Sequence, residues 1–257
     1  MKDFVRNTYV IARNTFKESV RDKVFYVIFA FAFVFIGFTI FLGSISLGED
    51  LLVVRALGLA CVYFFGLLIA IFLGISLVYK ELERRTLYFI LSKPVTASEV
   101  ILGKFAGLFS SVAVSICGMA AVYLAVVAFE GGGFDGYALI AILFELLELA
   151  VLVALSTFFS SFAKPLASAL YALLIIYIGH SLDLLTFAVR NSGMFMQGLV
   201  KALYVLLPNL DKFNQREEVI AGILPHVEEA VFSLGYAAIY IAILLYAATI
   251  LLHKRDL

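Results

Sequence analysis

Four ionisable residues interrupt long apolar stretches of this chain, and their spacing makes them the groups that could do chemistry. Glu145 and Glu148 lie three positions apart in one stretch, and His180 and Asp183 lie three positions apart in the next. Residues at this spacing share one face of a helix. A charged side chain in hydrocarbon is unfavourable, so all four should face the protein interior or water. They are candidates for a polar patch along a substrate path, for a proton-sensitive site, or for interhelical contacts in which His180 or Asp183 meets a polar neighbour.

The residue pattern argues against a metal centre, a nucleophilic site or a nucleotide site in this chain. It contains no H-E-x-x-H sequence to hold zinc on one helix, and no serine in a strand–turn–helix elbow. Gly103-Lys104 lacks the upstream glycine of a phosphate-binding loop and is followed by Phe105. Cys61 and Cys117 both lie in apolar stretches, where thiols act as small hydrophobic groups. We expect no metal, no cofactor and no catalytic residue.

The elements that must position the four ionisable residues are six apolar stretches, each of about 20 residues or more. Helices are the natural way to cross a membrane, because the backbone there must satisfy its own hydrogen bonds. The chain is 63% hydrophobic and only 15% charged, far from the balance of a soluble domain. The sequence predicts an all-α membrane protein, a single domain over residues 1–257 with a six-span bundle over 24–252. The predicted spans are Val24–Gly43, Ala56–Tyr79, Phe105–Phe129, Tyr137–Ala163, Pro165–Val189 and Phe232–Leu252.

Lysine and arginine are distributed unevenly between the two sides of these spans. Six precede the first span, five lie between the second and third, one lies between the fourth and fifth, and two follow the last. The opposite side carries Arg55 and four more in the long connection 190–231. The positive-inside rule therefore predicts that both termini are cytoplasmic. We expect a multi-pass protein of the cell (inner) membrane, in contact with lipid and without a nucleic acid partner.

The segment 1–23 predicts an amphipathic helix that lies in the membrane interface. Read at 100° per residue, five apolar residues fall in a narrow arc and three basic residues lie on an adjoining face. Such a helix places its apolar stripe at the acyl boundary and its cations at the headgroups. The alternative is an ordinary basic flank that only sets the topology. The stripe consists of Val5, Tyr9, Ala12, Phe16 and Val20, and the basic face of Arg6, Arg13 and Lys17.

The cytoplasmic segment Lys80–Lys104 combines a charged stretch, a short amphipathic stretch and a helix start. Pro94 ends the amphipathic stretch, because proline disfavours helix in the residue before it. Thr96-Ala97-Ser98-Glu99 predicts a capping box, with Val95 and Val100 in the positions of a hydrophobic staple. The third span should therefore begin at a defined point. A short surface helix held between two helix ends can transmit a push from a soluble partner into the membrane.

This segment resembles the cytoplasmic signature of ABC-2 type transporter permeases, which reads approximately E-x-E-x-G-T-L, then L-x-x-P-V, then E-x-x-x-G-K. Arg85 stands where the family commonly has glycine, which changes the local turn. The resemblance extends over the whole chain: an amphipathic N-terminal "elbow" helix, six spans, a long external connection and a basic end. The matching residues are Glu81, Glu83, Thr86, Leu87, Leu91, Pro94, Val95, Glu99, Gly103 and Lys104.

The resemblance implies the permease subunit of an ATP-driven ABC transporter, and we expect it to be an exporter. Two such subunits, alike or different, would form the substrate pathway, and separate cytoplasmic ABC ATPase subunits would bind ATP and magnesium. The connection 190–231 would hold short external helices. In agreement, Met194–Leu207 is apolar but too short to span, and Pro208 ends it. The residues implied in ATPase coupling are Glu81, Glu83, Arg84, Arg85, Thr86, Leu87 and Pro94.

Two other classes of protein remain as alternatives. An intramembrane enzyme would use Glu145, Glu148, His180 and Asp183, but it has no need of a stiff cytoplasmic lever. A secondary transporter would show internal repeats with broken helices at matching positions, and the two three-span halves show no such self-similarity. The elbow helix and the segment 80–104 favour the permease.

Overall fold

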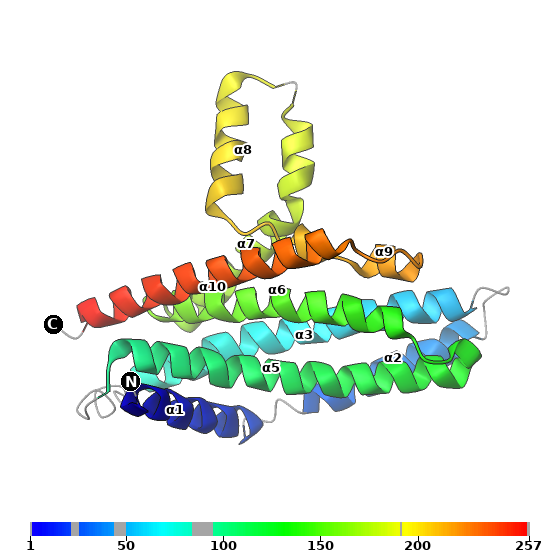
Figure 1. Ribbon diagram of the computed structural model, residues 1–257, viewed down its shortest axis with the longest axis horizontal. Coiled ribbons are helices and arrows are strands. Elements are labelled where there is room, and N and C mark those ends of the chain that lie inside the picture. Colours follow the sequence, from blue (N-terminus) through cyan, green and yellow to red (C-terminus); the bar gives the residue numbers. More distant parts are fainter. Residues whose placement is uncertain (1, 22–25, 44–49, 84–94, 191, 256–257) are drawn as a thin grey trace.

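The computed structural model describes residues 2–21, 26–43, 50–83, 95–190 and 192–255, and these residues form helices without a strand (Figure 1). The predicted all-α architecture is confirmed. The long helices are α1 (Lys2–Arg21), α2 (Tyr26–Gly43), α3 (Asp50–Glu83), α5 (Ala97–Val127), α6 (Gly136–Ser160), α7 (Pro165–Ala188) and α10 (Val227–Arg255). The short elements are the π-helical turn η1 (Ala128–Gly132), α8 (Met194–Leu206), the 3-10 turn η2 (Asp211–Phe213) and α9 (Arg216–Ile220).

The number of helices able to cross a membrane agrees with the predicted six spans. Five helices are long and apolar enough by themselves, and a sixth span is reached when α1 and α2 are counted as one bent pair. α2 has 18 residues and no charged side chain, which corresponds to roughly 27 Å at 1.5 Å per residue. α3 extends beyond its predicted apolar stretch at both ends, and α5 begins eight residues before its predicted stretch, directly after the N-cap Thr96.

The bundle has two ends, which we call the basic end and the far end. The basic end holds the starts of α5 and α7, and the far end holds η1 and the start of α6.

At the basic end the predicted capping box is confirmed. The backbone N–H of Glu99 donates to the Thr96 hydroxyl at 3.3 Å, and the N–H of Thr96 donates to a Glu99 carboxylate oxygen at 2.7 Å. Val95 and Val100 lie in one apolar cluster with the last turns of α10, so the start of α5 is held in place.

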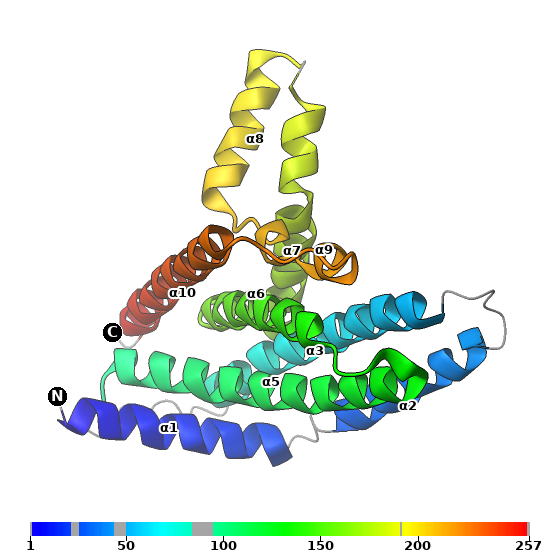
Figure 2. The same ribbon diagram turned by 45° about the vertical axis from the view of Figure 1, so that its right-hand side comes forward.

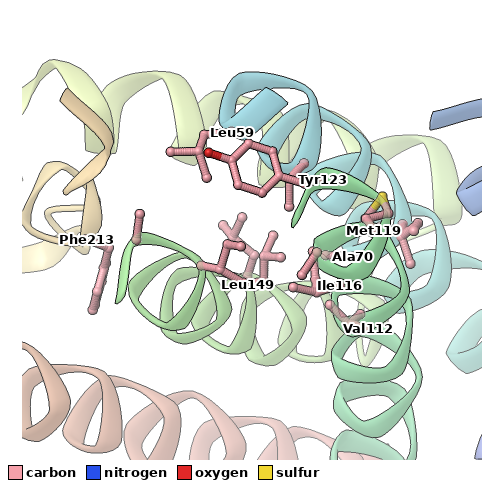
Figure 3. Packing of buried hydrophobic residues seen from close by; sticks show 14 of the residues in the cluster. Leu59, Ala70, Val112, Ile116, Met119, Tyr123, Leu149 and Phe213 are labelled. Atoms are coloured by element: carbon pink, nitrogen blue, oxygen red, sulfur yellow. The ribbon is translucent and has the colours of Figure 1, made fainter. Parts of the chain in front are cut away.

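The hydrophobic core lies where α3, α5 and α6 meet. α6 contacts α3, α5, α7 and α10, and its residues 151–157 are all buried. Figure 3 shows Ile116 of α5 beside Leu149 of α6. Gly66 of α3 allows this approach, because a Cβ there would lie 2.7 Å from Ile116 Cδ1 and 3.0 Å from Leu149 Cδ1.

α3 also packs closely against α6 at the small residues that follow Gly66 by one and two helical turns. A Cβ on Gly74 would overlap the Cβ of Ser156. The Ser160 hydroxyl donates to the Gly74 carbonyl at 3.0 Å. Ala70 is fully buried and, with Gly66 and Gly74, forms a stripe of small residues at every fourth position of α3. The stripe therefore serves packing within this chain, as close backbone approach does in membrane bundles generally.

α1 lies beside the first turns of α5 (Figure 1). Asn7 Nδ2 donates to Glu99 Oε1 at 3.3 Å, and further along both helices a Cβ on Gly107 would lie 2.5 Å from the Ala12 carbonyl oxygen. Gly103, one turn before Gly107, makes a similarly close contact. Because the contacts advance together, α1 and α5 run side by side in the same direction. The predicted position of α1 in the membrane interface stays a prediction.

Part of the apolar stripe of α1 faces away from α5. Val5 and Tyr9 are 64% and 66% exposed, whereas Thr15 and Ser19 are buried against the bundle. The Ser19 hydroxyl donates to the Thr15 carbonyl at 2.9 Å, so this buried donor is satisfied. The exposed apolar surface at Val5 and Tyr9 suits contact with lipid. Of the other predicted elbow residues, Phe16 is half-buried and Arg6, Arg13 and Lys17 are exposed.

α7 and α8 form a hairpin that projects from the rest of the bundle (Figures 1 and 2). α8 has 13 residues and ends shortly before Pro208, so the prediction of an apolar helix too short to span is confirmed. The hairpin exposes large apolar side chains, among them Tyr177 and Leu184 on α7 and Phe195 and Val205 on α8. Lipid or another protein surface would cover such a face.

Three helices are joined at the far end by a buried carboxylate. Asp135 caps α6 by accepting the N–H of Ala138 at 3.2 Å, and it accepts the Tyr123 hydroxyl at 3.0 Å. Arg55 Nε lies 3.1 Å from the same carboxylate. Arg55, which the sequence analysis counts only as a charge on one side of the membrane, therefore ties α3 to the start of α6.

Candidate functional site

Three side chains from three helices meet in the middle of the bundle. The Tyr63 hydroxyl of α3 donates to Glu148 Oε1 of α6 at 2.8 Å. His180 Nε2 of α7 lies 2.9 Å from the same carboxylate oxygen and 2.7 Å from the Tyr63 hydroxyl. Glu148 is only 1% exposed. One carboxylate oxygen thus joins α3, α6 and α7.

The depth of this contact follows from the helix lengths. Tyr63 lies 12 residues after Leu51, where the span of α3 begins, and Glu148 lies 12 residues after Gly136, the start of α6. At 1.5 Å per residue both positions are roughly 18 Å from the far end. The polar contact is therefore near the middle of a bilayer's ~30 Å hydrocarbon core.

Glu145 lies one turn before Glu148 and is 2% exposed. Neither of its carboxylate oxygens makes a hydrogen bond within the described part of the chain. Its Oε1 points at Gly66 of α3, where an added Cβ would approach it to 3.2 Å. Gly66 is three residues after Tyr63, so both glutamates of α6 face the same side of α3.

A cation from a distant part of the chain completes this arrangement. The Arg216 guanidinium carbon, on α9, lies 3.8 Å from the centre of the Tyr63 ring, a cation–π geometry. Its Nε donates to the Asn214 side-chain oxygen at 2.9 Å. Arg216 also lies within electrostatic range of Glu145. We call Tyr63, Glu145, Glu148, His180 and Arg216 the polar cluster.

The segment between α8 and α10 folds back onto the bundle and carries Arg216 to the polar cluster. Leu210 N–H donates to the Gly179 carbonyl at 3.2 Å, and a Cβ on Gly179 would lie 2.8 Å from the Pro208 carbonyl oxygen. Buried Asn209 donates to the Asp183 carboxylate at 3.1 and 3.2 Å, and its N–H donates to the Tyr236 hydroxyl at 2.8 Å. α9 itself contacts α3 and α6.

The structure therefore separates the four ionisable residues that the sequence singles out. Glu148 and His180 meet each other, as the interhelical interpretation predicts, and Glu145 lies beside them without a hydrogen-bond partner among the described residues. Asp183 is exposed and holds Asn209 instead. Sequence reasoning missed Tyr63 and Arg216. A phenol within an apolar span was a usable signal for Tyr63, but nothing local distinguished Arg216 from its neighbours.

The polar cluster combines a phenol, an imidazole, two carboxyl groups and a guanidinium. Within the described residues, no group of three or more His, Cys, Asp and Glu side chains could hold a metal ion. His180 Nε2 contacts a phenol and a carboxylate, and no serine or cysteine among the described residues shares that contact. The arrangement can bind positive charge, through two carboxylates and an aromatic face, and it can hold three helices together.

The residues implied in ATPase coupling lie at the basic end or beyond the described residues. The backbone of Glu81 and Glu83 forms the last turn of α3. Arg84, Arg85, Thr86, Leu87 and Pro94 lie outside the described ranges. Their role stays a prediction.

Residues 9–257 match the model of a family described as ABC-2 family transporter protein. The matched region includes most of α1 and every later helix, and with them the whole polar cluster. No individually curated protein matches the chain.

Proposed function

The chain belongs to the ABC-2 transporter family, and from that premise we propose that it is the permease of an ATP-driven exporter, coupled to a separate ATPase. It is a multi-pass membrane protein and a transport subunit. The observation that carries the proposal is the family match over residues 9–257, on a chain with five to six helices able to span a membrane. The cell (inner) membrane with cytoplasmic termini is the proposed location, in accord with the charge distribution.

The contact between α1 and α5 supports a mechanical role for the basic end. Glu99 accepts the N–H of Thr96 in the capping box and the side-chain amide of Asn7 on α1. Gly103 and Gly107 bring the backbones of the two helices close together. A displacement of the segment before Thr96 would therefore move the starts of α1 and α5 as one unit.

The proposed ATPase docks on residues 81–94, which join the end of α3 to the capped start of α5. ATP and magnesium are bound by that partner, and this chain contributes no cofactor site. Charged residues at the edge of such an interface control association and partner choice. The alternation of Glu81, Glu83, Arg84 and Arg85 gives the segment both signs of charge for this contact.

Reversing two of these charges tests the coupling. We expect Glu83→Lys combined with Arg84→Glu to lower substrate-stimulated ATP hydrolysis of the reconstituted complex roughly tenfold, because the opposing charges of the ATPase would then be repelled. Hydrolysis is measured in liposomes, with insertion checked by protease accessibility. The matched control is Lys201→Glu with Glu228→Lys, a reversal of two exposed charges remote from the basic end. Normal coupling of the first variant would show that residues 81–94 only set the topology.

A second permease subunit, identical or related, is the proposed partner within the membrane. The large apolar side chains exposed on α7 and α8 supply a surface that such a subunit could cover. We expect native mass spectrometry of the complex in nanodiscs to find two permease chains and two ATPase chains. A monomeric permease that transports without ATP would overturn the proposed function.

A further inference from the structure

The polar cluster contains more buried carboxyl oxygens than its hydrogen bonds use. Glu148 is engaged by Tyr63 and His180, whereas both oxygens of Glu145 lack a hydrogen-bond partner among the described residues. Glu145 is 2% exposed. Buried polar groups are nearly always hydrogen-bonded, and an unpaired carboxylate in a span is expected to serve a binding function.

The cation that lies near this carboxylate is on a short helix outside the long spans. Arg216 covers the face of the Tyr63 ring at 3.8 Å and lies within electrostatic range of Glu145. It belongs to α9, which has only five residues and is followed by Gly222 with φ of 77°. Its Nε is hydrogen-bonded to Asn214 of the same segment, so the guanidinium is oriented by its own loop and not by Glu145.

We propose that Tyr63, Glu145 and Glu148 form a binding site for a monovalent organic cation, and that Arg216 occupies this site as a competitor built into the chain. A guanidinium or alkylammonium group takes the place of the Arg216 side chain, with its charge over the Tyr63 ring and toward Glu145. Aromatic faces bind such cations well once water is excluded. The proposal names the substrate class of the proposed transporter, and it rests on that function only for the cation's role as cargo.

The walls of the site favour an organic cation over a metal ion. Beside Glu145, the aliphatic side chains of Ile116 and Leu149 pack closely around Gly66. A hard divalent ion requires several oxygen ligands to replace its water, and Ile116 and Leu149 add none to those of the two glutamates and Tyr63. An organic cation carries its own apolar surface, which the face of the Tyr63 ring can contact, as it contacts Arg216.

Direct binding to the permease in nanodiscs tests this proposal without the ATPase. The probes are benzyltrimethylammonium and its uncharged isostere neopentylbenzene, measured by isothermal titration calorimetry against empty nanodiscs. We expect Arg216→Ala to bind the cation about two- to thirtyfold more tightly than the native chain, because the competitor is gone. Glu145→Gln should weaken binding roughly tenfold or more. The uncharged isostere should bind no more tightly to Arg216→Ala than to the native chain.

Lys212 provides a matched control. Its ammonium lies 4.8 Å from the ring centres of Phe232 and Tyr236, so it makes a cation–π contact in the same segment but away from the glutamates. Lys212→Ala should leave the affinity unchanged. If Arg216→Ala does not fold, Arg216→Gln removes the charge with a smaller loss of volume and carries the same expectation. Three results would overturn the proposal: unchanged or weaker binding of the cation to the folded Arg216 variant, native affinity of Glu145→Gln for the cation, or binding of the isostere as tight as that of the cation. A loss of ATP-driven transport alone would count only against the proposed function.

Discussion

Gly107→Ala is expected to detach α1 from α5. The new Cβ would lie 2.5 Å from the Ala12 carbonyl oxygen and 2.7 Å from Thr15 Cβ, and the first of these atoms belongs to the backbone and cannot rotate away. We expect the free energy of unfolding to fall by about 1–3 kcal/mol, the range found when a well-packed contact is overfilled. Titration with sodium dodecyl sulfate in mixed micelles, followed by circular dichroism, measures this change.

Gly118→Ala on the same helix is the control for this substitution. There the nearest atom to the new Cβ is the end of the Ile28 side chain, at 3.2 Å, which can move. Alanine is also the better helix former, so stability should stay equal or rise. Equal stability of the Gly107 and Gly118 variants would show that α1 does not depend on its close contact with α5.

Glu148→Ala is expected to have the largest effect in the middle of the bundle. The substitution leaves the Tyr63 hydroxyl and His180 Nε2 without the oxygen that both contact, at a position that is 1% exposed in the native chain. Removing one partner of a buried polar contact leaves the other unsatisfied, and a cavity adds to the loss. We expect the free energy of unfolding to fall by about 3 kcal/mol in the same titration.

Two further variants separate the hydrogen bonds from packing. Glu148→Gln keeps the shape and one acceptor oxygen, so its loss should be about 1 kcal/mol. A double-mutant cycle of Glu148→Gln with Tyr63→Phe should give a coupling energy of about 0.5–3 kcal/mol. Ser181→Ala, which removes a hydroxyl bonded only to the Tyr177 carbonyl of its own helix, serves as the reference. A Glu148→Ala variant as stable as Ser181→Ala would contradict this account.

Much of the fold was decided by local properties of the sequence. The apolar stretches predicted the spans because the length of a helix and the thickness of a bilayer leave little choice. Thr96 and Glu99 predicted the start of α5, because a capping box is formed by residues three positions apart. The short apolar stretch before Pro208 predicted α8, because proline ends a helix and 14 residues are too few to span a bilayer.

The candidate site could be predicted only in part. The spacing of Glu145 and Glu148 placed both on one helix face, and the unfavourable energy of charge in hydrocarbon directed that face inward. Which neighbour each would meet depended on how helices far apart in the sequence pack. Glu148 contacts His180, 32 positions away, and accepts a hydrogen bond from Tyr63, 85 positions away. Glu145 makes no hydrogen bond among the described residues.

The tertiary structure alone decided where Arg216 and α1 lie. Arg216 reaches the Tyr63 ring because Leu210 packs on Gly179 and folds the segment after α8 back onto the bundle, a contact with no periodic signature. The hydrophobic pattern of α1 identified an amphipathic helix. Its position beside α5 depends on Gly103 and Gly107, which allow the backbones of the two helices to approach closely. Periodicity reports which face of a helix is apolar, whereas the neighbour that covers the other face is selected by shape, which is known only when the helices are assembled.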